Sequence, residues 1–385
     1  MGSTANKLFW LGSVLCWMVG IVISCPTDLC TCNVNNQIIC SSRKLEKVPK
    51  FNRKTSDKVY DLLDLSQNEI EYVNPKAFMH VRTKAISLSR NPLIGISPRA
   101  LYGLKDVLEI LDLYDTQLYV LHWGLLRNLY TLRELNLGRN GMFALPRGLF
   151  EGLIHLQDLS LTWNKIATLK AGVFRNLHML RNLNLLGNQI NEIEAGSFEN
   201  MRHLRTLNLN NNQMRHINPL SLQGLQELEN LYLEANLLMD VPTAIFILLP
   251  AIRAINLAKN NISLIPSRAF IGADTLEKIL LNENVIHNIS SDAFYGLTHL
   301  SKLKLDDNKL QTFGEDCILR GITGTAKELD LRNNPVDCTC RIAWIHELNI
   351  RGTKVEGQCV SPAAFSGAQL SNLNFTLCDS YKCLD

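Results

Sequence analysis

The feature of this sequence that most constrains its fold is a motif, L-x-L-x-x-N, that recurs about every 24 residues through most of the chain. From position 116 to position 308 every step is 24 residues, and threonine replaces asparagine only at 116. So regular a register indicates a repeat architecture in which each repeat stacks on the next. We call the motif's last position the ladder position, and its asparagines are Asn68, Asn91, Asn140, Asn164, Asn188, Asn212, Asn236, Asn260, Asn284, Asn308 and Asn334.

Each L-x-L predicts one short β-strand, because side chains alternate between the two faces of a strand and both leucines then point the same way. Strands of adjacent repeats are expected to pair in parallel, about 4.8 Å apart. A second apolar column is expected to fill the outer half of the core. It lies ten residues after each ladder position and contains Phe78, Leu101, Leu126, Phe150, Phe174, Phe198, Leu222, Phe246, Phe270, Phe294 and Ile318.

The ladder asparagines are predicted to be structural. After each strand the chain turns inward, which leaves backbone groups without strand partners, and each buried group left unpaired costs about 1–3 kcal/mol. An asparagine amide supplies one acceptor and two donors for such groups. Thr116 supplies only a hydroxyl, so its repeat is expected to be locally weaker.

The first 24 residues predict a secretory signal peptide. They carry one charge, Lys7, followed by an apolar run that ends at Ile23, and cleavage is expected near Ser24. The run is short for a membrane span, although an uncleaved N-terminal anchor is the alternative. No later stretch is apolar for long enough to cross a bilayer, so we expect a secreted chain in the extracellular space or matrix.

Cysteines lie only toward the two ends of the chain, with none between Cys40 and Cys317. Ten remain beyond residue 24, and an even number in an oxidising compartment favours disulfides. The alternative is zinc binding by the C-x-C pairs. The predicted signal peptide favours disulfides over zinc, because it directs the chain to an oxidising compartment.

Both ends also resemble known sequences. CPTDLCTCNVNNQIIC, at 25–40, resembles the cysteine-rich N-terminal cap of extracellular leucine-rich repeat proteins, and NPVDCTCRIAWIHEL, at 334–348, resembles their C-terminal cap. The resemblance covers 25–378 and includes modules of Slit, the Nogo receptor, chondroadherin, the acid-labile subunit, Toll ectodomains and lamprey lymphocyte receptors. It implies an α/β, right-handed leucine-rich repeat solenoid, a curved horseshoe with a parallel concave sheet and disulfide-bonded caps.

The resemblance also implies a domain organisation and a bond pattern. The expected segments are a signal peptide at 1–24, an N-terminal cap at 25–58, about twelve repeats at 59–334, a C-terminal cap at 335–378 and a tail at 379–385. The implied disulfides are Cys25–Cys32, Cys30–Cys40, Cys338–Cys359 and Cys340–Cys378. Cys317 and Cys383 have no counterpart in that pattern. We expect them to bond to each other, and a covalent homodimer through Cys383 is the alternative.

A ligand is expected to bind on the concave face, where side chains flanking each L-x-L point to solvent. Large exposed aromatics on a rigid sheet are typical of interface hot spots, although scattered exposed apolar residues are also normal. The candidates are Tyr114, Arg139, Trp163, Leu186, Asn210, Tyr232, Glu234, Lys259, Leu280, Glu283, Lys304 and Asp306.

Two further kinds of surface site are expected. A basic stretch could contact sulfated glycans or be an ordinary solvated rim; it contains Arg43, Lys44, Lys47, Lys50, Arg53, Lys54 and Lys58. N-glycosylation sequons begin at Asn261, Asn288 and Asn374.

The function predicted from these features is non-enzymatic protein binding in the extracellular space. The partner would be a matrix, receptor or growth-factor-type protein; alternatives are a soluble innate-immune receptor for microbial ligands and a matrix component that binds glycosaminoglycan or collagen. No phosphate loop, nucleophile elbow or zinc motif is present, so neither catalysis nor a cofactor or metal is expected. A net charge of +3 does not favour nucleic acid as a partner.

Overall fold

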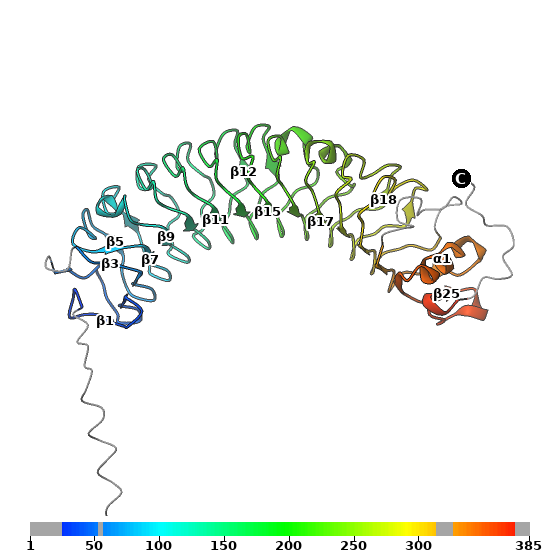
Figure 1. The fold of residues 1–385 in the computed structure, drawn as a ribbon, viewed down its shortest axis with the longest axis horizontal. Coiled ribbons are helices and arrows are strands. Elements are labelled where there is room, and N and C mark those ends of the chain that lie inside the picture. The colour runs from blue at the N-terminus through cyan, green and yellow to red at the C-terminus, as the bar shows by residue number, and fades with distance from the viewer. Residues whose placement is uncertain (1–24, 53–56, 313–325, 374–385) are drawn as a thin grey trace, which may run out of the picture.

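The structure, a computed structural model, describes residues 25–52, 57–312 and 326–373. These residues form a curved solenoid whose inner edge is lined by short strands, one from each turn (Figure 1). In the described residues the strands make one 15-stranded sheet, parallel except at its first pair. The sheet contains, in spatial order, β1 (Thr31–Cys32), β2 (Gln37–Ile39), β4 (Leu62–Asp64), β7 (Ala85–Ser87), β9 (Ile110–Asp112), β10 (Glu134–Asn136), β11 (Asp158–Ser160), β13 (Asn182–Asn184), β15 (Thr206–Asn208), β16 (Asn230–Tyr232), β17 (Ala254–Asn256), β19 (Lys278–Leu280), β21 (Lys302–Lys304), β22 (Glu328–Asp330) and β24 (Lys354–Glu356).

Short elements complete the turns away from the inner sheet. Short strands, each of two or three residues, form separate two-stranded sheets. They are β3 (Val59–Tyr60) with β6 (Arg82–Thr83), β5 (Tyr72–Val73) with β8 (Gly95–Ile96), β12 (Thr168–Leu169) with β14 (Glu192–Ile193), β18 (Leu264–Ile265) with β20 (Asn288–Ile289), and β23 (Val336–Asp337) with β25 (Cys359–Ser361). The helices are α1 (Trp344–Ile350) and the 3-10 turns η2 (Tyr102–Leu104), η3 (Pro219–Leu222), η4 (Thr243–Leu248), η5 (Cys340–Ile342), η6 (Ala363–Phe365) and η7 (Leu370–Asn372).

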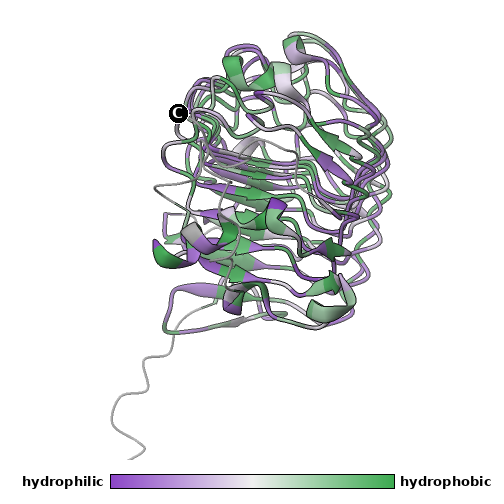
Figure 2. Cartoon of the chain, turned by 90° about the vertical axis from the view of Figure 1, so that its right-hand side faces the viewer, coloured by the Kyte–Doolittle hydropathy of each residue, from purple (hydrophilic) through white to green (hydrophobic). Residues whose placement is uncertain are grey.

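The predicted parallel solenoid is confirmed, and its register follows the sequence repeat. In β10 and β11, Leu135 is opposite Leu159, exactly one 24-residue repeat later. Leu135 and Leu137 are both buried, as the alternation of side chains requires. Viewed along the stack, successive turns overlie one another, with hydrophobic and hydrophilic residues alternating along the chain (Figure 2).

Each ladder asparagine is buried and links adjacent turns. Nδ2 of Asn188 donates to the carbonyl of Leu185 in its own turn at 3.0 Å and to that of Leu161 in the preceding turn at 2.9 Å. Its Oδ1 accepts from the backbone N–H of Ile166 at 3.2 Å. The amide therefore satisfies three backbone groups that the inward turn removes from the strand ladder.

The ladder is interrupted at Thr116. Its hydroxyl has one proton to donate, and two acceptors lie within reach of it: the carbonyl of Leu113 at 3.0 Å and Oδ1 of Asn140 at 2.8 Å. It has no second donor to reach the preceding turn. There the N–H of Leu93 bonds instead to the carbonyl of Asn91, two residues away, at 2.8 Å.

Replacing Thr116 with asparagine is expected to stabilise the fold. The new amide can donate to the preceding turn and accept from Leu93, which should raise the free energy of unfolding by about 1 kcal/mol. Urea unfolding of the two proteins measures the difference. The half-exposed Thr162→Asn variant is the control and should change stability little, whereas a less stable Thr116→Asn protein would contradict this account.

The second apolar column forms a buried aromatic spine. Phe174 stacks between Phe150 and Phe198, with ring centroids 5.8 and 5.9 Å apart. Phe270 likewise lies between Phe246 and Phe294, at 5.2 and 5.7 Å. Leu222 separates the two stacks, because its turn carries no aromatic ring at this position. Ile318 lies outside the described residues.

The two caps extend the sheet at both ends. In the N-terminal cap, β1 and β2 form a hairpin, and β2 pairs in parallel with β4 of the first repeat. In the C-terminal cap, β24 pairs in parallel with β22. Cap backbone therefore covers each open end of the solenoid, where leucine side chains would otherwise face water.

Disulfides hold both caps. The structure pairs Cys25 with Cys32 and Cys30 with Cys40 at the N-terminal end, and Cys338 with Cys359 at the C-terminal end. Cys340 is also disulfide-bonded. Three expected partners, Cys378, Cys317 and Cys383, lie outside the described residues, as does the proposed signal peptide at 1–24.

Candidate functional site

The candidate concave residues lie in two columns. Tyr232, Leu280 and Lys304 lie on the strands, and Tyr114, Leu186 and Glu234 lie two residues after a strand ends. Arg139, Trp163 and Lys259 lie later, one residue before the ladder asparagine, where φ is 54–55°. This left-handed backbone marks the second column, which we call the edge column. We call the strand column and this edge column together the inner face.

The aromatic members of the inner face are available to a partner. The side chain of Trp163 is 54% exposed, and Tyr114 and Tyr232 are half-buried. All three belong to the central and N-terminal turns. Rigid, partly exposed aromatic side chains contribute large contact area at low entropic cost.

The charged members are mostly paired with neighbouring turns. Nζ of Lys259 lies 2.8 Å from Oε1 of Glu234 and 3.7 Å from Glu283, and Nδ2 of Asn256 donates to the same Glu234 carboxylate at 3.0 Å. The hydrogen bond to Glu234, and then its charge, raises the pKa of Lys259. Arg139 lies 3.7 Å from Asp115. Such exposed pairs contribute little stability, but a partner has to compete with them.

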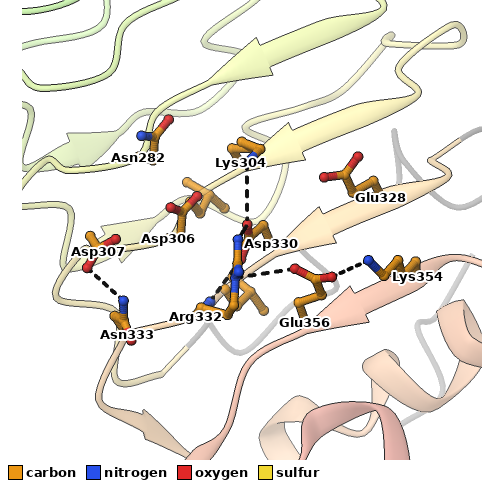
Figure 3. A network of polar contacts seen from close by, with 12 residues as sticks. Asn282, Lys304, Asp306, Asp307, Glu328, Asp330, Arg332, Asn333, Lys354 and Glu356 are labelled. Atoms are coloured by element: carbon orange, nitrogen blue, oxygen red, sulfur yellow. Dashed lines mark hydrogen bonds and ion pairs between the residues drawn. The ribbon is translucent and has the colours of Figure 1, made fainter.

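The C-terminal end of the inner face is a polar network (Figure 3). Asp330 is fully buried and accepts from Nε and Nη2 of Arg332 at 2.8 and 2.6 Å, while Lys304 lies 3.7 Å away. Arg332 also lies 3.2 Å from Glu356, which pairs with Lys354. Lys304 is therefore held within this network.

Two aspartates of the network have opposite pKa shifts. Burial by itself would raise the pKa of Asp330, but the hydrogen bonds and charge of Arg332 outweigh it and hold that pKa below its ordinary value. Burial, and then the charge of Asp330, raises the pKa of Asp306. Oδ1 of Asp306 is buried and has no hydrogen-bond partner among the described residues.

The other expected surface sites are exposed where the structure describes them. Arg43, Lys44, Lys47, Lys50 and Lys58 are exposed at the N-terminal cap, and Lys58 lies 4.8 Å over the ring of Tyr60. Arg53 and Lys54 lie outside the described residues. Asn261 and Asn288 are exposed on the flank that follows the ladder, and Asn374 lies outside the described part.

The sequence analysis missed an apolar stripe on that same flank. Ile94, Tyr119 and Phe143 each lie three residues after a ladder position in consecutive turns, and they are 79%, 58% and 63% exposed. Reading the column three residues after the ladder would have found them. They form a second surface that is distinct from the inner face.

The residues that the structure describes contain neither a candidate membrane span nor a candidate metal site. No helix in this part of the chain is long and apolar enough to span a membrane. Nor does any group of three or more His, Cys, Asp or Glu side chains in these same ranges have the arrangement of a metal site.

A family model described as leucine rich repeat matches six overlapping windows: residues 106–166, 131–190, 180–238, 226–286, 250–310 and 274–320. Together they cover more than half of the chain. The chain is a leucine-rich repeat protein. A comparison with curated protein sequences found no significant match.

Solved structures similar to this leucine-rich repeat protein share its fold at low identity. One is a chain of the octameric complex of Latrophilin 3, Unc5D and FLRT2 (LRR): TM-score 0.68, 24% identity, covering 91% of this chain and 98% of that one. The mouse RP105/MD-1 complex gives TM-score 0.64 and 22% identity, covering 82% of this chain and 58% of that one. The Drosophila Toll–Spatzle complex gives 0.66 and 21%, covering 88% and 54%.

Proposed function

We propose that this leucine-rich repeat protein is a secreted, non-enzymatic binding protein that engages an extracellular protein partner through its inner face. The observation that carries the proposal is the set of partly exposed aromatics Tyr114, Trp163 and Tyr232 on one rigid sheet. A parallel sheet whose every turn is tied to the next holds these rings in fixed positions, so little conformational entropy is lost on binding.

The cap disulfides and the fold neighbours support the extracellular part of the proposal. Disulfides persist in oxidising compartments and are rare in the cytosol. The neighbours come from complexes that contain Unc5D, MD-1 or Spatzle together with a leucine-rich repeat chain. By analogy of fold, a protein partner is the first expectation for this chain as well.

The test compares two triple-alanine variants of the full chain. One removes Tyr114, Trp163 and Tyr232 from the inner face. The matched control removes Ile94, Tyr119 and Phe143, three large exposed residues on the flank. Partners captured from the extracellular extract of the source tissue are expected to bind the unchanged protein and the flank variant, and to bind the inner-face variant at least about 30-fold more weakly.

The opposite pattern would refute the proposal. If the inner-face variant keeps full affinity while the flank variant loses it, the binding surface is the apolar stripe. All six side chains are at least partly exposed, so both variants are expected to remain folded. Thermal unfolding of each variant checks this.

A further inference from the structure

Two aromatic rings of the inner face lie across glycines of the following turn. A Cβ added to Gly187 would lie 2.5 Å from Cε3 of Trp163, and one added to Gly138 would lie 2.9 Å from Cδ2 of Tyr114. Real Cβ atoms do not approach other atoms so closely. Each ring therefore occupies the space that the absent glycine side chain leaves, one 24-residue repeat later.

Backbone conformation alone does not require glycine at 187. Its φ is +71°, but Asn211 and Ala235 hold the same position in later turns with φ of 53° and 55°. Residues other than glycine are thus accepted in this column. At 187 only glycine leaves room for the ring of Trp163. Gly187 is therefore a positioning residue for that ring.

A hollow of about 430 Å³ opens on strands β9, β10, β11 and β13. Tyr114 and Trp163 do not line it, but they follow two of its lining residues closely along the chain, Asp112 of β9 and Ser160 of β11. Three carboxylates from consecutive turns line it: Asp112, Glu134 and Asp158. In the described part of the chain none of the three forms an ion pair. Two of them accept hydrogen bonds from uncharged side chains instead. Oδ2 of Asp112 accepts from the hydroxyl of Ser87 at 2.9 Å, and Oδ1 of Asp158 accepts from Nδ2 of Asn182 at 2.6 Å.

Fixed donors line the same hollow. Oδ1 of Asn136 accepts from the N–H of Gly138, and Oδ1 of Asn184 accepts from the N–H of Leu186, both at 3.1 Å. These bonds use the oxygen of each amide. The two Nδ2 groups therefore remain as donors with no partner among the described residues, and the hydroxyl of Ser160 lies on the strand between them.

A ligand for this hollow has to donate and accept hydrogen bonds and also present an apolar face. A cationic side chain only donates and would leave both amide N–H groups unpaired. An anion would meet three carboxylates. A sugar ring has hydroxyls that both donate and accept, and its C–H face packs on aromatic rings.

We propose that the inner face from β9 to β13, with Tyr114 over Gly138 and Trp163 over Gly187, binds a neutral saccharide. The two rings lie about two turns apart, or about 10 Å at the spacing of paired strands. That span corresponds to a short oligosaccharide. The inference shares its face with the proposed function but does not need a protein partner, because free saccharides test it directly.

The experiment titrates the full chain with free neutral oligosaccharides of glucose, mannose, galactose or N-acetylglucosamine, four to six sugars long, and follows tryptophan fluorescence and calorimetry. Binding of at least one series is expected. Gly187→Asn should weaken it about tenfold, because the new Cβ displaces Trp163 although asparagine suits the backbone. Ala235→Asn, which places asparagine in the same column two turns later, is the control and should bind as the unchanged protein does. Ser160→Ala should weaken binding about fivefold without touching the rings.

Three results would overturn the saccharide inference. One is no binding of any neutral series by a protein that is shown to be folded. The second is equal affinity of Gly187→Asn and Ala235→Asn. The third is an inner-face protein partner whose affinity is unchanged when glycosidases remove its glycans, while free sugars do not bind. That last result would leave the proposed protein-binding function intact. Loss of binding on glycosidase treatment would instead support the inference and identify a protein-borne glycan as the source.

Discussion

Replacing Phe174 with alanine is expected to lower the free energy of unfolding by about 3–5 kcal/mol. The ring is fully buried and stacks between Phe150 and Phe198, so the variant loses both ring contacts and leaves a cavity in the spine. A solenoid is stabilised by contacts between neighbouring turns, and the damage should therefore spread to the adjacent repeats. Urea unfolding measures the loss, and hydrogen exchange shows its extent along the chain.

Phe174→Leu is the matched control. Leucine already occupies this column at 101, 126 and 222, where each side chain is buried. The leucine variant should therefore lose clearly less stability than the alanine variant, about 1–2 kcal/mol. Equal losses in the two variants would contradict this expectation and show that leucine cannot replace the aromatic ring at 174, whatever volume it fills.

Replacing Asn188 with alanine is expected to cost about 3 kcal/mol. The N–H of Ile166 would lose the acceptor that the structure gives it, and the carbonyls of Leu161 and Leu185 would each lose one of two donors. The carbonyl of Leu161 retains a bond from Asn164, and that of Leu185 retains one from Asn212. The N–H of Ile166 is therefore the main contributor, and its amide should lose protection from hydrogen exchange.

Asn188→Thr separates hydrogen bonding from packing. Threonine occupies the ladder at 116, fully buried, and bonds there through its hydroxyl. The threonine variant should recover less than half of the loss, because the hydroxyl at 116 accepts no bond from the preceding turn, where the N–H of Leu93 bonds to the carbonyl of Asn91 instead. If alanine and threonine are equally tolerated and the Ile166 amide stays protected, the ladder contributes less than its bonds suggest.

The fold could be read from the sequence because its determinants lie at fixed spacing. A leucine pair, a ladder asparagine and a spine residue recur together, and parallel pairing of identical turns is the arrangement that buries all three columns at once. Leu135 opposite Leu159 and Phe174 against Phe198 both follow from that spacing alone. The three cap disulfides that the structure describes came from a family resemblance rather than from spacing.

The inner face was less predictable, because its properties depend on which side chains meet between turns. Its residues could be chosen by position, but only the structure pairs Lys259 with Glu234 and so removes two charges from the free surface. The apolar stripe at Ile94 was missed because it lies on the flank, away from the strand pattern.

The solenoid, its register and its buried columns all follow from the repeat, since periodic hydrophobic burial has one solution at this spacing. The directions of the side chains on the inner face, by contrast, depend on contacts between turns that only the folded structure brings together. Trp163 lies over Gly187 because the two are brought into contact by stacking, and its direction is set by the space that the glycine leaves. Periodicity places a residue in a column, whereas the rotamer and the neighbour in the next turn decide what that residue presents to a ligand.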